Sequence, residues 1–395
     1  MNTAATAATP PAVPRPDASA DRPGPGGTRA RWHPVTVAEV CPLTPDAVAL
    51  TLEAPAALRE VFADRPGRHV VVRHRRPDGE LRRTYSLCPP PDDPTALRLV
   101  IKRGAPDGFG ALAARLAPGD HLELSSPTGH FALPDLPGAH HVLIAGGSGI
   151  TPLAALAADV LRRDPACRVS LVHSVPTAAH ALLSDELAAL KDTFLDRFTV
   201  QYVLTRDEGA AGGAAFRGRI DAGLLSRLLT VLDARPSGDT AFALCGPPGL
   251  IATVRRFLDG WGAEPGLVRW ELFTPDAAPA DAAPADPAPA AVTHSTPPPP
   301  AAGAGHVTVL LDGHRRHATV GPQDTVILDA LLRAHPDVPY ACREGVCGSC
   351  RAKVLSGRVR ADRQHALDDH DRAAGYTLVC RARPETPEVV LDFDA

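Results

Sequence analysis

Between residues 339 and 350 the chain reads Pro339-Tyr340-Ala341-Cys342-Arg343-Glu344-Gly345-Val346-Cys347-Gly348-Ser349-Cys350. The gaps between these cysteines are unequal, four residues and then two, and a distant fourth cysteine follows at Cys380. Plant-type [2Fe–2S] proteins use this spacing, whereas zinc sites more often use paired short gaps. Gly345 and Gly348 allow a tight loop whose backbone amides point at the sulfurs. We therefore expect Cys342, Cys347, Cys350 and Cys380 to ligate a [2Fe–2S] cluster, with a structural zinc ribbon as the alternative.

Length and composition limit the classes of function. A chain of 395 residues exceeds one ordinary domain and predicts two or three. The formal net charge of −4 provides no basic field for nucleic acid or an acidic membrane surface, so we expect neither as a partner. The first thirty residues lack the basic and apolar segments of a secretory signal, and no apolar run approaches a membrane span. These features predict a cytoplasmic protein, where clustered cysteines indicate metal ligation rather than disulfides.

Hydrophobic periodicity divides the chain. Short alternating runs at 69–73 and 97–101, separated by Pro, Gly and Asp turns, predict a small β-barrel. From residue 141, strands at 142–145, 168–173 and 199–204 alternate with helices at 152–161 and 184–189, which predicts a parallel sheet with helices on both faces. After residue 306, a hairpin at 307–311 and 316–320 precedes a helix at 327–334.

Pro275 to Gly305 is rich in Ala, Pro, Asp and Gly and includes Pro297-Pro298-Pro299-Pro300, so it cannot build a core. We expect an extended linker that lets the following domain move between two docking sites. The predicted organisation is multidomain: a disordered tail at 1–30, an antiparallel β-barrel at 31–136, an α/β parallel-sheet domain at 137–274, the linker at 275–305 and an α+β domain with the cysteine motif at 306–395.

Two motifs before the linker are compatible with cofactor binding. Arg83-Thr84-Tyr85-Ser86 ends a strand, where an arginine fork suits a phosphate and a tyrosine ring packs against a flavin. Such a run is more often the two faces of an ordinary strand. Ala145-Gly146-Gly147-Ser148-Gly149-Ile150-Thr151-Pro152 follows a strand and opens a helix, which suits a pyrophosphate or an ordinary turn equally well.

A third motif, Leu244-Cys245-Gly246-Pro247, places a thiol at the end of an apolar strand, where open α/β sheets bind ligands. A buried, inert cysteine is its commoner meaning. The order of these motifs, followed by Trp270-Glu271-Leu272-Phe273, resembles the ferredoxin–NADP reductase family. With the C-terminal cysteine motif included, residues 31–395 resemble the oxygenase reductases, nearest to the reductase subunits of phenylacetyl-CoA epoxidases.

The resemblance implies an enzyme that passes electrons from NAD(P)H through FAD and the [2Fe–2S] cluster to a partner oxygenase of di-iron or Rieske type. It implies that the barrel at 31–136 is the flavin domain, that the α/β domain at 137–274 is the nucleotide domain and that 306–395 is a β-grasp ferredoxin domain. It implies catalytic roles beside the hydride path for Ser86, Cys245 and Glu271, with Ser86 near flavin N5. It implies that cofactors are held by Arg83, Thr84, Tyr85, Ser86, Ile101, Lys102, Gly108, Phe109, Gly110, Gly146, Gly147, Ser148, Gly149, Thr151, Arg206, Cys245, Gly246, Pro247 and Phe273. Pro127-Thr128-Gly129-His130-Phe131 is similar to the FAD-binding members, so FAD is expected.

Two departures from the family pattern concern the cofactor contacts. Gly108-Phe109-Gly110 lacks the usual Ser or Thr at its end, and Gly249-Leu250 replaces the usual methionine after Cys-Gly-Pro. Arg206 could meet a 2′-phosphate, although the adjacent Asp207 opposes it, so NADPH is expected ahead of NADH. The alternatives are a reductase for a cytochrome P450 or another acceptor, and a non-enzymatic redox carrier or sensor.

Overall fold

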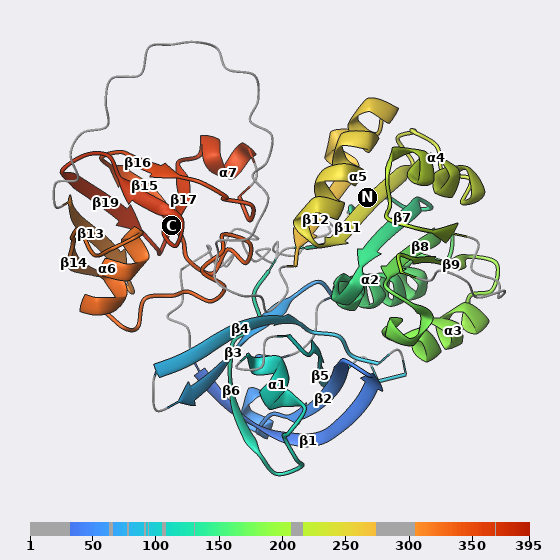
Figure 1. Ribbon diagram of the computed structural model, residues 1–395, viewed down its shortest axis with the longest axis horizontal. Helices are drawn as coiled ribbons and strands as arrows, with labels where there is room; N and C mark the ends of the chain where they lie inside the picture. The colour runs from blue at the N-terminus through green and yellow to red at the C-terminus, as the bar shows by residue number, and fades with distance from the viewer. Residues whose placement is uncertain are drawn as a thin grey trace, which may run out of the picture.

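The computed structural model describes residues 32–62, 66–76, 79–90, 92–93, 95–104, 108–129, 131–206, 216–273, 305–367 and 369–395. They form three bodies, which Figure 1 shows as a barrel in blue and cyan, a parallel-sheet domain in green to yellow and a C-terminal domain in orange and red. The predicted tail, nearly all of the predicted linker, His130 and Asp207 lie outside the described residues.

The barrel is a six-stranded antiparallel sheet in the order β4-β3-β6-β1-β2-β5, and a bridge between Leu87 and Leu99 joins its two ends. Alternate residues point inward, and Leu50, Leu99 and Leu124 are fully buried there. The predicted antiparallel barrel is confirmed. Its elements are β1 (Trp32–Thr44), β2 (Ala47–Glu53), η1 (Ala56–Leu58), β3 (His69–Arg76), β4 (Gly79–Ser86), β5 (Leu97–Lys102), α1 (Phe109–Ala113) and β6 (His121–Ser125).

The parallel-sheet domain has the strand order β10-β9-β8-β7-β11-β12, with every neighbouring pair parallel. One face of the sheet packs against α2 and α3 and the other against α4 and α5. Its elements are β7 (His140–Gly146), η2 (Gly147–Gly149), α2 (Ile150–Arg163), β8 (Arg168–Val175), η3 (Ala178–His180), α3 (Ser184–Thr193), β9 (Phe198–Leu204), β10 (Phe216–Arg217), α4 (Ala222–Val231), β11 (Thr240–Gly246), α5 (Pro248–Trp261), η4 (Pro265–Leu267) and β12 (Val268–Leu272).

The strand order reverses between β7 and β11. At such a switch point the loops after two adjacent parallel strands diverge and leave a crevice for a ligand. Pro248 is the first residue of α5, a position that suits proline because the N–H of a first-turn residue has no intrahelical partner. The glycine turn after β7 and the Cys-Gly-Pro turn after β11 therefore face each other across this crevice.

The C-terminal domain has a mixed five-stranded sheet in the order β14-β13-β19-β15-β17, crossed by α6, and a separate β16-β18 pair. Strands β13 and β19 are parallel, and the other pairs of this sheet are antiparallel. The predicted β-grasp fold is confirmed. Its elements are β13 (Gly305–Leu311), β14 (His314–Val320), α6 (Ile327–Ala334), β15 (Arg351–Ser356), β16 (Val359–Ala361), α7 (Asp369–Ala373), β17 (Tyr376–Leu378), β18 (Ala382–Pro384) and β19 (Glu388–Asp392).

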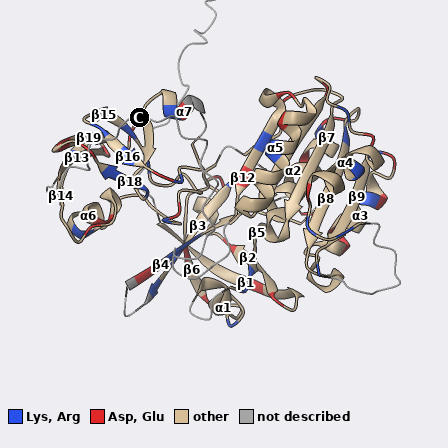
Figure 2. Cartoon of the chain, turned by 45° about the horizontal axis from the view of Figure 1, so that its top comes forward, with Lys and Arg blue, Asp and Glu red and all other residues tan. Residues whose placement is uncertain are grey.

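Basic and acidic residues are interspersed along all three bodies (Figure 2). Within the described part of the chain, none of the helices has both the length and the apolar character needed to cross a lipid bilayer.

Candidate active site

The three bodies meet at a cleft of about 290 Å³. One wall is the end of β4, a second is formed by the turns after β7 and β11 with the end of β12, and the third is the cysteine loop of the C-terminal domain. The cleft is lined by His69, Arg83, Thr84, Tyr85, Ser86, Val100, Lys102, Arg103, Gly104, Gly146, Gly147, Ser148, Thr151, Pro247, Glu271, Leu272, Phe273, Cys342, Glu344, Val346 and Cys347. Residues predicted from motifs far apart in the chain thus share one space.

The β4 wall has the polar character that a flavin needs. Arg83 lines the cleft while its Nη1 donates to the carbonyl of Arg82 at 2.9 Å. The hydroxyl of Thr84 is buried and has no hydrogen-bond partner among the described residues. A buried hydroxyl without a partner is costly, so a ligand atom at this position would satisfy it. The residues of this wall fit a bound flavin.

Several residues predicted to touch the flavin lie behind this wall instead. Phe109 is 1% exposed, and its ring lies 5.7 Å from that of Tyr85. Ile101 is fully buried in the barrel core. A Cβ added to Gly110 would lie 2.4 Å from the carbonyl oxygen of Lys102, so this glycine allows α1 to pack closely on the chain after β5. Neither Gly108 nor these three residues line the cleft.

The glycine turn after β7 is shaped by close contact with the turn after β11. A Cβ on Gly149 would lie 2.2 Å from the carbonyl oxygen of Cys245, a distance that no side chain tolerates. Gly147 has a φ of +55°, and its carbonyl accepts a hydrogen bond at 3.0 Å from Nε2 of His173. Burial lowers the pKa of His173 to about 4, so the imidazole is neutral near pH 7. The turn presents the start of α2 to the cleft, which suits a nucleotide phosphate.

Cys245 and Glu271 are paired across β11 and β12. Burial raises the pKa of the Cys245 thiol well above its ordinary value. Burial, with Cys347 nearby, also raises the pKa of Glu271 to about 8. Oε2 of Glu271 has no hydrogen-bond partner among the described residues, and Oε1 lies 3.7 Å from Nδ1 of His69. Glu271 therefore lines the cleft mainly as a neutral carboxylic acid at pH 7, whereas Cys245 and Gly246 lie just behind it.

The remaining nucleotide prediction concerns Arg206. It lies exposed at the end of β9, and its backbone N–H donates to the carbonyl of Pro176 at 2.9 Å. Arg206 does not line the cleft. It lies beyond the C-terminal end of β9, where a bound nucleotide would extend out of the cleft.

The four cluster cysteines stand as two pairs. Cys342 contacts Cys347, and this contact lowers the pKa of Cys347 to about 6 while raising that of Cys342. Cys350 contacts Cys380, and both are nearly fully buried. In the part of the chain that the structure describes, no three His, Cys, Asp or Glu side chains converge on one metal ion. Two pairs of thiols suit two irons, each with two protein ligands, better than one tetrahedral zinc.

The loop that carries these cysteines is tightly constrained. Gly345 has a φ of +78°, and a Cβ there would lie 2.0 Å from the carbonyl oxygen of Arg363. The backbone N–H of Glu344 donates to Sγ of Cys342 at 3.3 Å. Arg343 in turn pairs with Asp329 at the start of α6, at 2.5 Å. Amide donors aimed at sulfur stabilise thiolate ligands, so the loop fits an iron–sulfur cluster.

Two histidines of the site have no motif that identifies them in the sequence. His69 lies at the start of β3, where Nε2 contacts the hydroxyl of Thr128 at 3.2 Å, and His173 lies near the end of β8. Each histidine contacts residues distant in the chain. Only the tertiary structure reveals these contacts.

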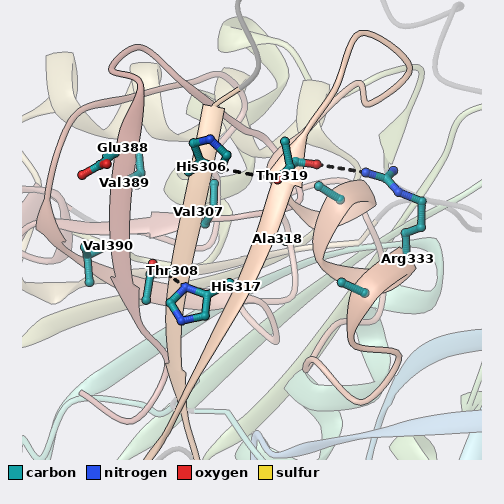
Figure 3. Close-up of a pocket in the computed structure, with 12 residues that line it drawn as sticks. His306, Val307, Thr308, His317, Ala318, Thr319, Arg333, Glu388, Val389 and Val390 are labelled. Carbon is teal, nitrogen blue, oxygen red and sulfur yellow. Dashed lines mark hydrogen bonds between the residues drawn. The ribbon is translucent and has the colours of Figure 1, made fainter.

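A separate hollow of about 640 Å³ lies on the sheet of the C-terminal domain (Figure 3). Its polar side chains pair across strands: Thr308 contacts His317 at 3.0 Å and Thr319 contacts His306 at 3.4 Å. None of the predicted site residues lines it. The chemistry that the sequence predicts is therefore gathered in the cleft between the bodies.

Comparisons with known proteins agree with this arrangement. Three family models match, the "Oxidoreductase FAD-binding domain" at 34–133, the "Oxidoreductase NAD-binding domain" at 143–256 and the "2Fe-2S iron-sulfur cluster binding domain" at 309–385. A component of the 1,2-phenylacetyl-CoA epoxidase of Escherichia coli (strain K12) is 32% identical over 369 residues, which cover 92% of this chain and 98% of the relative.

A second relative is similar over almost its whole length. The ferredoxin reductase component of 3-ketosteroid-9-alpha-monooxygenase from Rhodococcus rhodochrous is 32% identical, over 91% of this chain and 96% of that protein. The solved structure of phthalate dioxygenase reductase shares the fold, with a TM-score of 0.54 at 22% identity over 91% of this chain and 98% of that one. The chain thus belongs to the family of oxygenase reductase components that join FAD-binding, NAD-binding and [2Fe–2S] domains in one polypeptide.

Proposed function

We propose that this protein is the reductase component of an oxygenase system and delivers electrons from NAD(P)H to a partner oxygenase. The observation that carries the proposal is the single cleft, in which the β4 motif, the glycine turn and two cluster cysteines line one space. Redox centres that share a cleft are close enough for electrons to pass between them without a separate carrier.

When bound, the flavin accepts a hydride and the cluster accepts single electrons, which converts two-electron chemistry into one-electron chemistry. We assign Arg83 to the flavin phosphate, Thr84 and Ser86 to hydrogen bonds with the flavin, and Phe273 to the ring face that the nicotinamide approaches. Lys102 lines the cleft beside the flavin wall, and we assign it and Gly108 to the flavin site. Ile101, Phe109 and Gly110 support this wall through the core and backbone packing described above.

On the nucleotide side, the proposed contacts are those of the glycine turn, Gly146 to Thr151, and of Cys245, Gly246 and Pro247. Glu271 would face the nicotinamide of a bound coenzyme, and Cys245, paired with it across β11 and β12, would lie behind it. Burial keeps both groups uncharged near pH 7, so neither repels the hydride electrostatically. Arg206 at the end of β9 favours NADPH, since a guanidinium suits the 2′-phosphate.

The acceptor is proposed to be an oxygenase, of di-iron or Rieske type, and the proposal is supported by relatives that are components of an epoxidase and of a monooxygenase. We also propose the domain limits 31–136, 137–274 and 306–395 with a linker at 275–305. We propose a cytoplasmic location, since four clustered cysteines retain a cluster most readily in a reducing compartment.

The experiment that tests the function uses the holoprotein purified without oxygen. NADPH should reduce both ferricyanide, at the flavin, and cytochrome c, through the cluster. Cys342→Ser should abolish only the reduction of cytochrome c, whereas Cys41→Ser, at an exposed cysteine outside the site, should change neither. Zinc in place of iron and sulfide, or no oxidation of NADPH, would overturn the proposal.

A further inference from the structure

A stack of alternating cations and aromatic rings joins the barrel to the C-terminal domain. Cζ of Arg73 lies 4.2 Å from the centroid of the Trp32 ring, and Cζ of Arg82 lies 5.1 Å from the same ring. On the other side, Cζ of Arg82 lies 4.1 Å from the ring of Tyr340, and Cζ of Arg343 lies 5.7 Å from it. Trp32, Arg73 and Arg82 belong to the barrel, and Tyr340 and Arg343 belong to the cysteine loop.

Arg82 is the centre of this stack and is held firmly. It is 5% exposed, and its Nε donates to Oε1 of Glu80 at 2.6 Å. Its Nη1 also donates to the backbone carbonyl of Tyr340 at 3.3 Å. A guanidinium between two rings, with a carboxylate behind it, is oriented before the second ring arrives, which lowers the entropic cost of docking.

The stack lies next to the redox cleft. Arg82 and its neighbour Arg83 lie on opposite faces of β4. Arg82 contacts Tyr340 of the C-terminal domain, and Arg83 lines the cleft. Tyr340 is two residues before the cluster ligand Cys342. Docking of Tyr340 on Arg82 therefore fixes the position of the cluster loop relative to the flavin wall.

The cysteine loop also contacts the parallel-sheet domain. Val346 packs against the core of the parallel-sheet domain. Beside these contacts lies a groove of about 1170 Å³ between the bodies, lined by Trp32 and Tyr340 among others. Because this groove leaves part of the interface open, we expect a buried, well-packed stack to contribute a large share of its stability.

We propose that Arg82 is the docking residue for the C-terminal domain, holding Tyr340 so that the cluster receives electrons at the cleft and is released when the stack opens. The inference rests on the proposed function, because a domain that serves a separate acceptor must leave the flavin wall. The occupant of the site is the C-terminal domain of the same chain, joined to the parallel-sheet domain by residues 274–304. Arg82 acts as a positioning residue and touches no cofactor.

The test compares full-length holoproteins carrying Arg82→Ala, Arg82→Lys, Tyr340→Leu and the Arg82→Ala/Tyr340→Leu pair. The control is Arg75→Ala, on the neighbouring strand, whose guanidinium side chain is 69% exposed and also pairs with a carboxylate. Iron and sulfide content and NADPH-dependent ferricyanide reduction should match the wild type in all of them. Cytochrome c reduction should fall about ten-fold in Arg82→Ala and in Tyr340→Leu and stay unchanged in Arg75→Ala, and the double variant should fall no further than either single variant.

A second readout does not depend on turnover. In the oxidised holoprotein, hydrogen exchange of the backbone amides at 340–349 should accelerate about ten-fold in Arg82→Ala and Tyr340→Leu and stay unchanged in Arg75→Ala. Unchanged exchange together with unchanged cytochrome c reduction would refute the docking role. A rate of cluster reduction that falls on dilution would show that a second copy supplies the ring, which also refutes it. Wild-type protein that fails to reduce cytochrome c would refute the proposed function instead, and the exchange result would still decide the docking.

Discussion

Arg98 of the barrel and Glu186 of the parallel-sheet domain form a two-pronged ion pair, with Nη1 to Oε1 at 2.8 Å and Nη2 to Oε2 at 2.7 Å. The Arg98 side chain is only 9% exposed, and its Nε donates to the carbonyl of Cys88 at 2.6 Å. This pair fixes the barrel directly to α3. The pair therefore ties the flavin and nucleotide walls of the cleft together as one unit.

Arg98→Met should loosen that unit. Removing one partner leaves the Glu186 carboxylate facing a partly buried interface, so the free energy of unfolding should fall by about 2 kcal/mol. NADPH-dependent ferricyanide reduction should slow as well, because the two walls lose their alignment. Arg163→Met, which breaks a mostly exposed pair with Asp159, is the matched control and should cost less than about 0.5 kcal/mol. Equal losses in the two variants, measured by urea unfolding, would contradict this account.

Gly149→Ala should weaken nucleotide binding. The added Cβ meets the Cys245 carbonyl at 2.2 Å, so the turns after β7 and β11 must separate. We expect KM for NADPH to rise by about ten-fold or more, since small displacements of a phosphate-binding turn cost this much. Gly260→Ala places the same methyl group in open space within α5 and should leave KM unchanged while stabilising the helix. An unaltered KM in Gly149→Ala would show that the turn does not hold the nucleotide.

Gly345→Ala should prevent the cluster from assembling. The substitution combines a φ of +78° with a Cβ placed 2.0 Å from the Arg363 carbonyl. Gly313→Ala has a similar φ of +72° but open space around its Cβ, so it isolates the backbone strain, about 1 kcal/mol. Iron and sulfide per chain should drop sharply in the first variant and remain at the wild-type level in the second. A full cluster in Gly345→Ala would show that the loop can relax around the clash.

His173 should make the stability of the parallel-sheet domain depend on pH. Its pKa is about 4 in the folded protein and about 6.5 when unfolded, so the unfolded state binds more protons between these values. The stabilisation is present above pH 6.5 and is lost as the pH falls, by about 1.4 kcal/mol per pH unit. His173→Gln keeps a donor for Gly147 but cannot titrate, so its unfolding free energy should vary less between pH 7.5 and 5. As the control, His121→Gln at an exposed histidine should show the same pH dependence as the wild type. If His173→Gln also shows the wild-type pH dependence, His173 is already protonated in the folded protein and the account is wrong.

The local sequence pattern predicted most of the fold, because strands and turns form from residues that are neighbours in the chain. The apolar alternation at 168–173 lies within β8, and the hairpin around Asp312-Gly313 forms as expected because a Gly at positive φ suits the turn. The pairing of Cys342 with Cys347 follows from spacing in one loop. Such features depend on neighbours in the chain.

Contacts between bodies could not be predicted in this way. Arg82 is one of three charged residues on β4, and nothing in the local pattern indicates its burial, yet it is buried against Tyr340, 258 residues away. The motif around Phe109 predicts a contact with the flavin, but packing under Tyr85 places this ring in the barrel core. His69 and His173 acquire their environments from distant turns. These outcomes depend on how separate domains pack, which no local periodicity encodes.

The alternation along β4 links two tasks that would otherwise be independent. An insertion of one residue before Arg82 would turn the docking guanidinium inward and the flavin-side guanidinium outward, so that both surfaces would fail at once. A substitution in β4 therefore affects one of these contacts at a time, whereas an insertion or deletion disrupts both. Variation among natural or engineered forms of β4 should accordingly be confined to replacements, with its residue count held constant.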